Sequence, residues 1–327
     1  MRAKPALAIA GLGALTLAAA WAAYEDVRLP WQQLSLFERK FPGCVTGISS
    51  PDYGALQLRS GFRHFYLAWG DKFPVSEMKR RNSAPAILAL TWEPYLKTEE
   101  KRSLLGEIAG GRHDAYMRRL AAAIKGYGRP VMLSWGHEPN GDWYSWSGSA
   151  NGRSPELYIK AWRRMAAVLR AGGGPKLRLV FTVNAEDKPA ESWNRFENYY
   201  PGGAYADAVG LDVYNWGASR EWSSWRRPGQ LLKGPYARAL ALAPDKPLFL
   251  SEVASCNAGG SRALWLRRLL YQLEYRYTAV KGLVWFDYNK ECDWRLSADE
   301  TAGIYEKAAA DGYFKADAAR LAWFFGD

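Results

Sequence analysis

The sequence predicts a single (β/α)8 (TIM) barrel, an α/β fold, over residues 44–327. Short apolar runs, often β-branched, recur eight times, and each is followed by a polar loop. Helix-like stretches with the 3.6-residue period of amphipathic helices lie between them. No Gly-rich phosphate-binding loop follows the first run, which disfavours an open nucleotide-binding sheet. Strands that alternate with helices form right-handed units, and eight such units favour a closed parallel barrel.

The expected strands follow from the apolar runs, taken in chain order. They lie at residues 44–49, 62–69, 86–92, 131–135, 178–183, 208–214, 247–250 and 280–286. Amphipathic helices are expected at residues 113–125, 155–170 and 262–277, where basic side chains alternate with the apolar face. No linker rich in Pro or Ser interrupts the series, so we expect one domain.

Residues 1–23 are expected to lie outside the barrel. Arg2 and Lys4 precede an uncharged run rich in Ala and Leu, which is typical of a secretory signal segment. An uncleaved membrane anchor through residues 5–23 is the alternative, because about 18 apolar residues can just span a bilayer. Residues 24–43 are then a linker or N-terminal extension. We therefore expect an exported protein, either periplasmic or extracellular. A membrane tether through residues 5–23 is retained as an alternative.

The cysteine count fits export weakly. The sequence holds three cysteines, so at least one stays unpaired. Cys256 and Cys292 follow two neighbouring expected strands. A disulfide between them is one interpretation, and two free, partly buried thiols are the other.

Two glutamates follow expected strands at the end of a barrel where catalytic groups lie. Glu138 follows the fourth strand and Glu252 follows the seventh. A structural salt bridge to an arginine is the alternative for either glutamate alone, but it explains the two together poorly. Paired carboxylates at a barrel mouth can cleave glycosidic bonds. We expect the shorter, retaining separation of roughly 5 to 5.5 Å between the two carboxyl groups.

A long motif surrounds the first of these glutamates. It consists of His137, Glu138, Asn140, Gly141, Trp143, Tyr144 and Trp146 at fixed spacing. This spacing resembles the acid/base motif of glycoside hydrolase family 26, a (β/α)8 family of retaining endo-β-glycanases. Residues 210–215 and 293–295 also resemble the family's sixth strand and the segment after its eighth, and Glu252 matches the place of its nucleophile. The resemblance covers roughly residues 45–325.

The resemblance implies a role for each catalytic carboxylate. Glu138 would be the general acid/base, with a pKa raised toward neutrality by apolar neighbours and by the charge of Glu252. Glu252 would be the nucleophile, held ionised until it forms the glycosyl-enzyme intermediate.

Six further side chains are expected to bind substrate or to position the catalytic pair: His137, Trp143, Tyr214, Trp92, Trp285 and Asn140. The resemblance implies that His137 hydrogen-bonds within the site and that Tyr214 orients the nucleophile. An indole ring offers a flat apolar face to a pyranose and an N–H to its hydroxyl groups, which suits the three tryptophans. Packing in the barrel is the alternative for the tryptophans and for Tyr214, and a hydrogen-bonded position in the core is the alternative for His137.

The sequence is compatible with more than one polysaccharide substrate. β-Mannanases of the family often carry a sugar-binding His near the end of strand three, where this sequence reads Thr91-Trp92-Glu93-Pro94. A β-mannan and a mixed-linkage β-1,3-1,4-glucan are therefore both retained as substrates. Glu93 is a third carboxylate near the mouth, and we expect it to pair with a basic side chain rather than with a sugar hydroxyl.

Other functional classes are disfavoured. The net charge of +11 is spread over scattered basic doublets without a recognised module, which argues against a nucleic-acid partner. His64, His113 and His137 are the only histidines and form no His-x-x-x-His pair, so we expect neither a metal nor another cofactor. A non-hydrolytic carbohydrate-binding barrel, or a partner in processing or export of an envelope polysaccharide, remains the alternative function. We expect a monomer.

Overall fold

The computed structural model describes residues 43–51, 58–73, 75–81, 86–310 and 312–326. All of them belong to one compact unit, Ser35–Asp327. The signal segment or anchor and almost all of the linker that the sequence predicts lie outside the described residues. Within the described part of the chain, no helix combines the length and the apolar character that crossing a membrane requires.

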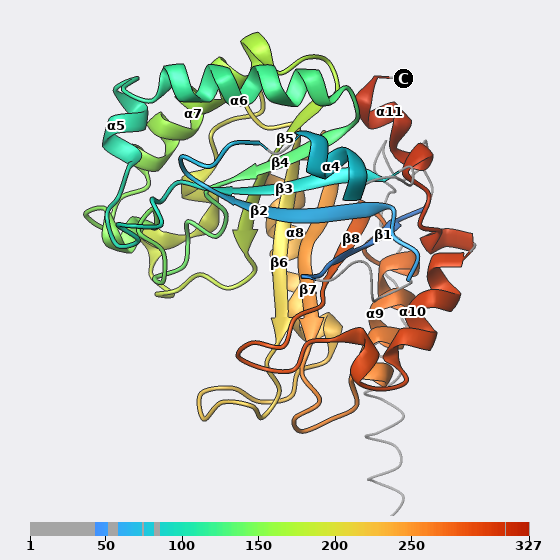
Figure 1. Ribbon diagram of the computed structural model, residues 1–327. Coiled ribbons are helices and arrows are strands. Elements are labelled where there is room, and N and C mark those ends of the chain that lie inside the picture. Colours follow the sequence, from blue (N-terminus) through green and yellow to red (C-terminus); the bar gives the residue numbers. More distant parts are fainter. Residues whose placement is uncertain (1–42, 52–57, 74, 82–85, 311, 327) are drawn as a thin grey trace, which may run out of the picture. The chain divides into compact units, whose positions relative to one another are not determined.

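The predicted (β/α)8 barrel is confirmed. Eight parallel strands close in chain order, with β8 pairing to β1 (Figure 1). The strands are β1 Val45–Ser49, β2 Phe62–Ala68, β3 Ile87–Glu93, β4 Val131–Trp135, β5 Leu177–Asn184, β6 Ala208–Asn215, β7 Leu248–Ser255 and β8 Val280–Phe286. Their bounds agree with the expected runs to within one residue, except at the end of β7.

Helices surround the barrel between the strands. They are α4 Val75–Arg81, α5 Leu105–Ala109, α6 Asp114–Tyr127, α7 Glu156–Gly172, α8 Pro228–Leu242, α9 Arg262–Tyr275, α10 Thr301–Ala310 and α11 Ala322–Phe325. Single turns of 3-10 helix lie at Gly148–Ala150, Ser192–Asn194, Phe196–Tyr199, Leu296–Ala298, Gly312–Phe314 and Ala318–Leu321. The three helices predicted from periodicity are present, with ends shifted by two residues or fewer. Gly128 ends α6 because its φ of 72° is one that glycine adopts without strain.

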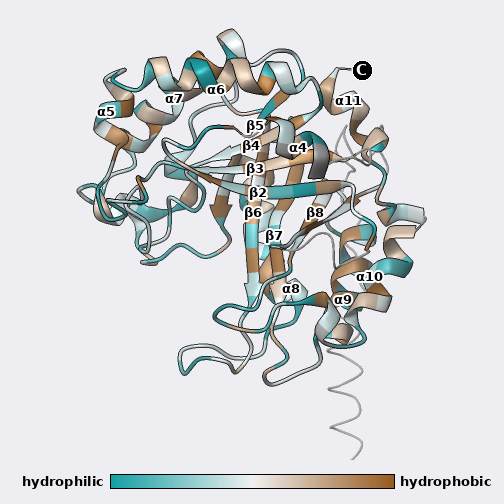
Figure 2. Ribbon diagram, viewed as in Figure 1, coloured by the Kyte–Doolittle hydropathy of each residue, from teal (hydrophilic) through white to brown (hydrophobic). Residues whose placement is uncertain are grey.

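The apolar faces of the helices pack on the outside of the barrel. Figure 2 shows hydrophobic residues along the strands, while the helices alternate hydrophobic and hydrophilic residues as amphipathic helices do. A second apolar cluster fills the N-terminal end of the barrel, where Phe62 and Phe249 meet edge to face and Phe324 of α11 packs on Phe249. The end of the described chain thus closes the bottom of the barrel, opposite the C-terminal ends of the strands.

Strand β7 extends five residues beyond its expected end. The apolar run stops at Leu250, but the strand continues to Ser255, so Glu252 lies within it rather than after it. The register shifts between Leu211 and Asp212 on β6, and again between Leu250 and Val253 on β7. Such irregularities re-aim side chains next to active sites. The apolar run ends before the strand does, because the last residues of β7 face a polar cleft rather than a core.

Candidate active site

A cleft of about 760 Å³ opens at the C-terminal ends of the strands. Glu138 and Glu252 both line it, and both are buried. The other lining residues are Tyr66, Glu93, Tyr95, His137, Trp143, Tyr144, Asn184, Glu186, Lys188, Tyr214, Trp216, Trp222, Phe286, Lys290, Glu291 and Trp294. The expected pair of carboxylates therefore shares one cavity with a band of aromatic rings.

The turn after β4 carries Glu138 in an unusual backbone conformation. Its φ is 50°, in the left-handed region that non-glycine residues rarely adopt, and Gly136 shares this region with a φ of 53°. The Glu138 amide donates to the Thr182 carbonyl at 3.0 Å, and the Trp146 indole donates to the His137 carbonyl at 2.8 Å. These contacts hold a conformation that costs energy, as is common where a catalytic side chain must be aimed.

Glu138 accepts one hydrogen bond on each oxygen. Asn184 donates to Oε1 at 2.7 Å, and the Trp143 indole donates to Oε2 at 2.9 Å. Burial and, after it, the negative charge of Glu252 raise the pKa of Glu138 to about 8, although the two hydrogen bonds oppose the shift. The carboxyl group thus holds a proton at neutral pH, as a general acid must.

Glu252 lies in a different environment. The Tyr66 hydroxyl donates to its Oε1 at 2.5 Å, and the Tyr214 hydroxyl donates to its Oε2. Burial raises the pKa of this carboxyl too, but both tyrosines and the ammonium group of Lys290 act against the shift. Both oxygens are therefore solvated by hydroxyl donors in place of water, which favours the ionised form that a nucleophile requires.

Tyr66 was not among the residues expected from the sequence. It lies on β2, in an apolar run that resembles the other barrel strands, and outside the motif around Glu138. The available signal was a phenolic hydroxyl within a buried strand, because a buried tyrosine usually finds a hydrogen-bond partner.

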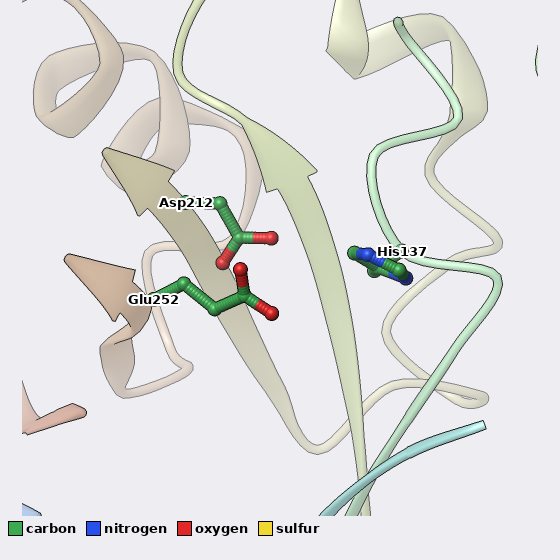
Figure 3. A group of neighbouring side chains, drawn as sticks. All are labelled: His137, Asp212 and Glu252. Atoms are coloured by element: carbon green, nitrogen blue, oxygen red, sulfur yellow. The ribbon is translucent and has the colours of Figure 1, made fainter. Parts of the chain in front are cut away.

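A histidine and a second acid lie beside the nucleophile. Asp212 of β6 is level with Glu252 of β7, and Figure 3 shows both side chains projecting toward His137. Potential ligand atoms of the three lie within 4.8 Å of one another. Burial raises the pKa of Asp212 well above its usual range, with the charges of Glu252 and Glu138 adding to the effect. Burial also lowers the pKa of His137 to about 3. The neutral form is thus favoured for both neighbours of the nucleophile.

These three side chains could offer ligands to a cation. The oxygens of Glu252 already accept the two tyrosine hydroxyls, and the Tyr144 hydroxyl lies 2.9 Å from Nε2 of His137. A cation on Glu252 would displace the hydrogen bonds that stabilise its carboxylate. The cluster therefore suits a nucleophile held by two hydroxyl donors better than a metal centre.

Three of the expected substrate-binding residues line the cleft: His137, Trp143 and Tyr214. Trp143 is 46% exposed, and its indole N–H is bonded to Glu138. Trp216 and Trp222, which sequence analysis did not select for the cleft, line it as well. Trp222 is 65% exposed, so its ring is available to a ligand.

The expectation for Trp92 and Trp285 was wrong, since both are 0% exposed. Trp92 stacks on Trp69 at 4.4 Å and meets Tyr116 of α6, which places it between barrel and helices. Trp285 donates from its indole nitrogen to the Trp294 carbonyl at 2.8 Å. Successive residues of a strand point to opposite faces, so a strand-end tryptophan can face the helices as readily as the cleft.

Asn140 also differs from expectation, because it is buried and does not line the cleft. Its Nδ2 donates to the Asn184 carbonyl and to Asp187, each at 2.9 Å, and its Oδ1 accepts from the Asn184 amide at 3.0 Å. Asn140 thus fixes Asn184, which in turn bonds Glu138. Sequence reasoning missed Asn184, which lies at the end of β5 outside the motif.

Glu93 does not pair with a basic side chain as expected. It lines the cleft without a hydrogen bond or ion pair from its carboxylate to any described residue. Burial, and then the charge of Glu252, raise the pKa of Glu93 to about 7, while Lys290 acts in the opposite direction.

The disulfide interpretation agrees with the structure. Cys256 follows β7 directly and is bonded to Cys292 in the loop after β8, with 6.1 Å between the Cα atoms. Cys44 is a buried free thiol, and burial raises its pKa to about 12.

Comparison with known sequences connects this geometry to a family. Glycosyl hydrolase family 26 matches residues 108–252, a segment that contains both Glu138 and Glu252. Endoglucanase H of Acetivibrio thermocellus is 34% identical over 257 residues, which cover 76% of this chain and 27% of that protein. A beta-1,3-xylanase of Alcaligenes sp is 24% identical over 226 residues, covering 61% of this chain and 43% of the relative. The chain thus spans less than half the length of these relatives.

Solved structures share the fold. An endo-beta-1,4-mannanase double mutant of Cellulomonas fimi superposes with a TM-score of 0.64 at 14% identity, covering 87% of this chain and 74% of the other. The mannanase man26 of Bacillus subtilis gives a TM-score of 0.59 at 15% identity, covering 87% and 90%. At such low identity the likeness concerns the barrel alone.

Proposed function

The chain belongs to glycosyl hydrolase family 26, and from this premise we propose that it is a retaining endo-β-glycanase. Glu138 is the general acid/base and Glu252 is the nucleophile. The observation that carries the proposal is the contrast between two buried carboxyl groups in one cleft. One has a pKa of about 8, and the other accepts two tyrosine hydroxyls that favour its charge.

The mechanism follows from these environments. The Glu252 carboxylate attacks the anomeric carbon while Glu138 gives its proton to the glycosidic oxygen, which leaves with the aglycone. The ester that forms removes the negative charge of Glu252, and with it one cause of the raised pKa of Glu138. Glu138, now ionised more easily, takes a proton from water, and the hydroxide oxygen displaces Glu252 from the sugar. Two displacements at one carbon retain its configuration.

The charge of the cleft favours a neutral polymer. Its lining residues include five glutamates and two lysines, so a polyanion would be repelled. The aromatic rings along it suit successive pyranose units. We place β-glucan first among substrates, since the relative named endoglucanase is 34% identical, and we keep β-mannan as the second candidate. Export is part of the proposal, and the Cys256–Cys292 disulfide supports it because such bonds persist in oxidising compartments.

A substrate panel tests the proposal. Purified protein is incubated with mixed-linkage β-glucan, β-mannan and xylan, and reducing ends are measured. Proton NMR of the first anomer released should show the β form. Glu138→Ala and Glu252→Ala should each lose orders of magnitude in rate. Binding without release of reducing ends from any polymer would instead support the carbohydrate-binding barrel, and an inverted first anomer would contradict the assignment of Glu252.

A further inference from the structure

Three charged side chains of the cleft have no hydrogen bond or ion pair to the described residues: Glu93, Lys290 and Glu291. Of these three, Glu93 is partly buried, while Lys290 and Glu291 are exposed. Lys290 makes only ring contacts, with its ammonium 5.7 Å from the centroids of Phe286 and Tyr288. By contrast, Glu186 in the same cleft is ion-paired with Arg226. A partly buried carboxylate without a partner is costly, so Glu93 indicates a ligand that pairs with it. The exposed ammonium of Lys290 lines the same cleft and can reach the same ligand.

The backbone of both residues is held by hydrogen bonds. Glu93 is the last residue of β3, and its carbonyl accepts from the Tyr95 amide at 2.9 Å. Lys290 lies in the loop after β8, where its amide donates to the Cys292 carbonyl at 3.2 Å. Cys292 is in turn bonded to Cys256 at the end of β7. The disulfide thus fixes the loop that carries Lys290 to the strand that carries the nucleophile.

The charges of both groups interact with the nucleophile, although Glu93 lies on the strand next to β4, which precedes the acid. Glu93 is level with Ala68 on β2, the strand that supplies Tyr66 to Glu252. Lys290 follows β8, which pairs with the nucleophile's own strand. The electrostatics agree, because Lys290 lowers the pKa values of both Glu93 and Glu252. The nucleophile bonds the anomeric carbon of the glycone, so side chains beside it face the glycone rather than the leaving group.

We propose that Glu93 and Lys290 form a charged clamp that hydrogen-bonds hydroxyl groups of the glycone and thereby determines which sugar epimer the enzyme accepts. The inference rests on the proposed function and extends it to substrate choice. A hydroxyl group can donate to the carboxylate and accept from the ammonium at once. A site built to hydrogen-bond a substrate hydroxyl discriminates strongly against a sugar that lacks it in that position.

The kinetic test uses Glu93→Gln and Lys290→Met with 2,4-dinitrophenyl β-cellobioside and β-mannobioside. Each variant should lose about 10- to 100-fold in kcat/KM on the preferred probe, since hydrogen bonds to charged groups are the strong ones. The ratio of kcat/KM between the two probes should change at least tenfold, which general loss of structure would not cause. Lys290→Arg should recover part of the loss. Asp71→Asn and Lys97→Met are the control, because this pair lies in the loops after β2 and β3 outside the cleft.

A binding test keeps the inference independent of turnover. In a Glu252→Ala background, calorimetry with cellotetraose and mannotetraose should show at least tenfold weaker binding after either clamp substitution. Unchanged affinity and an unchanged probe ratio would overturn the clamp, as would the absence of binding to both oligosaccharides. If wild-type protein binds through the clamp but cleaves no polymer, the proposed function fails while the clamp stands.

Discussion

Replacement of Tyr66 by Phe isolates one of the two hydrogen bonds to the nucleophile. The variant keeps the ring and removes a hydroxyl 2.5 Å from Oε1 of Glu252. A hydrogen bond to a charged group contributes about 1.5 to 3 kcal/mol. Since one pKa unit corresponds to about 1.4 kcal/mol, the pKa of Glu252 should rise by about 1 to 2 units.

The sign follows from the role of the carboxylate. Glu252 must be ionised to attack, so the acidic limb of kcat/KM reflects its pKa in the free enzyme. Loss of a donor that favours the charged form raises that pKa and moves the limb to higher pH. In the variant, Lys290 and Tyr214 still lower the pKa of Glu252 against the effect of burial. Glu138 becomes a negative neighbour in the same cleft when it ionises at high pH. At a pH on the limb, kcat/KM should fall about 10- to 100-fold.

The assay is a pH–rate profile with a 2,4-dinitrophenyl β-glycoside, whose leaving group needs no proton from Glu138. Tyr214→Phe should shift the limb in the same direction, because it removes the donor to the other oxygen. Tyr95→Phe is the matched control, since Tyr95 lines the cleft without a bond to Glu252. A lower rate with an acidic limb at its wild-type position would refute the reasoning.

Three further predictions concern other parts of the molecule. Glu138→Ala should lose about 10²- to 10⁴-fold on polysaccharide but retain glycosylation by the dinitrophenyl probe, and added azide should yield a β-glycosyl azide; an α product would contradict the proposed roles. Reduction of the Cys256–Cys292 bond, with a sequence separation of 36, should lower the free energy of unfolding by about 3 to 4 kcal/mol, seen as a lower guanidinium midpoint. An unchanged midpoint would argue against a stabilising role for this disulfide. Cys44 should resist thiol reagents in the native protein and give one reactive thiol after non-reducing denaturation; rapid native labelling would contradict its burial.

The barrel was predictable because each strand is buried on both faces and therefore reads as a short apolar run. The motif around Glu138 was predictable because its residues are close in sequence. The sequence did not predict the end of β7, because the last residues of this strand are partly polar. It also did not predict roles that depend on the direction in which a side chain points. Trp92 and Trp285 occupy strand ends that looked like cleft positions, yet both face away from it.

The supporting residues that sequence analysis missed share one property. Tyr66, Asn184 and Lys290 reach the site from β2, β5 and the loop after β8, far from the motif in sequence. Each contributes one polar group whose importance depends on closure of the barrel. A buried phenolic hydroxyl signals that a partner exists but not which one, and the amide and the ammonium carry no such signal until the two glutamates are beside them.

The left-handed backbone conformation of Glu138 creates a conflict between stability and catalysis at one position. Glycine adopts a φ of 50° without steric strain, so Glu138→Gly would relieve about 1 kcal/mol there while it removes the acid/base. A laboratory evolution scheme that selects only for heat resistance would therefore reward loss of the proton donor. Stabilisation of this enzyme has to be sought elsewhere, with hydrolysis retained in the screen.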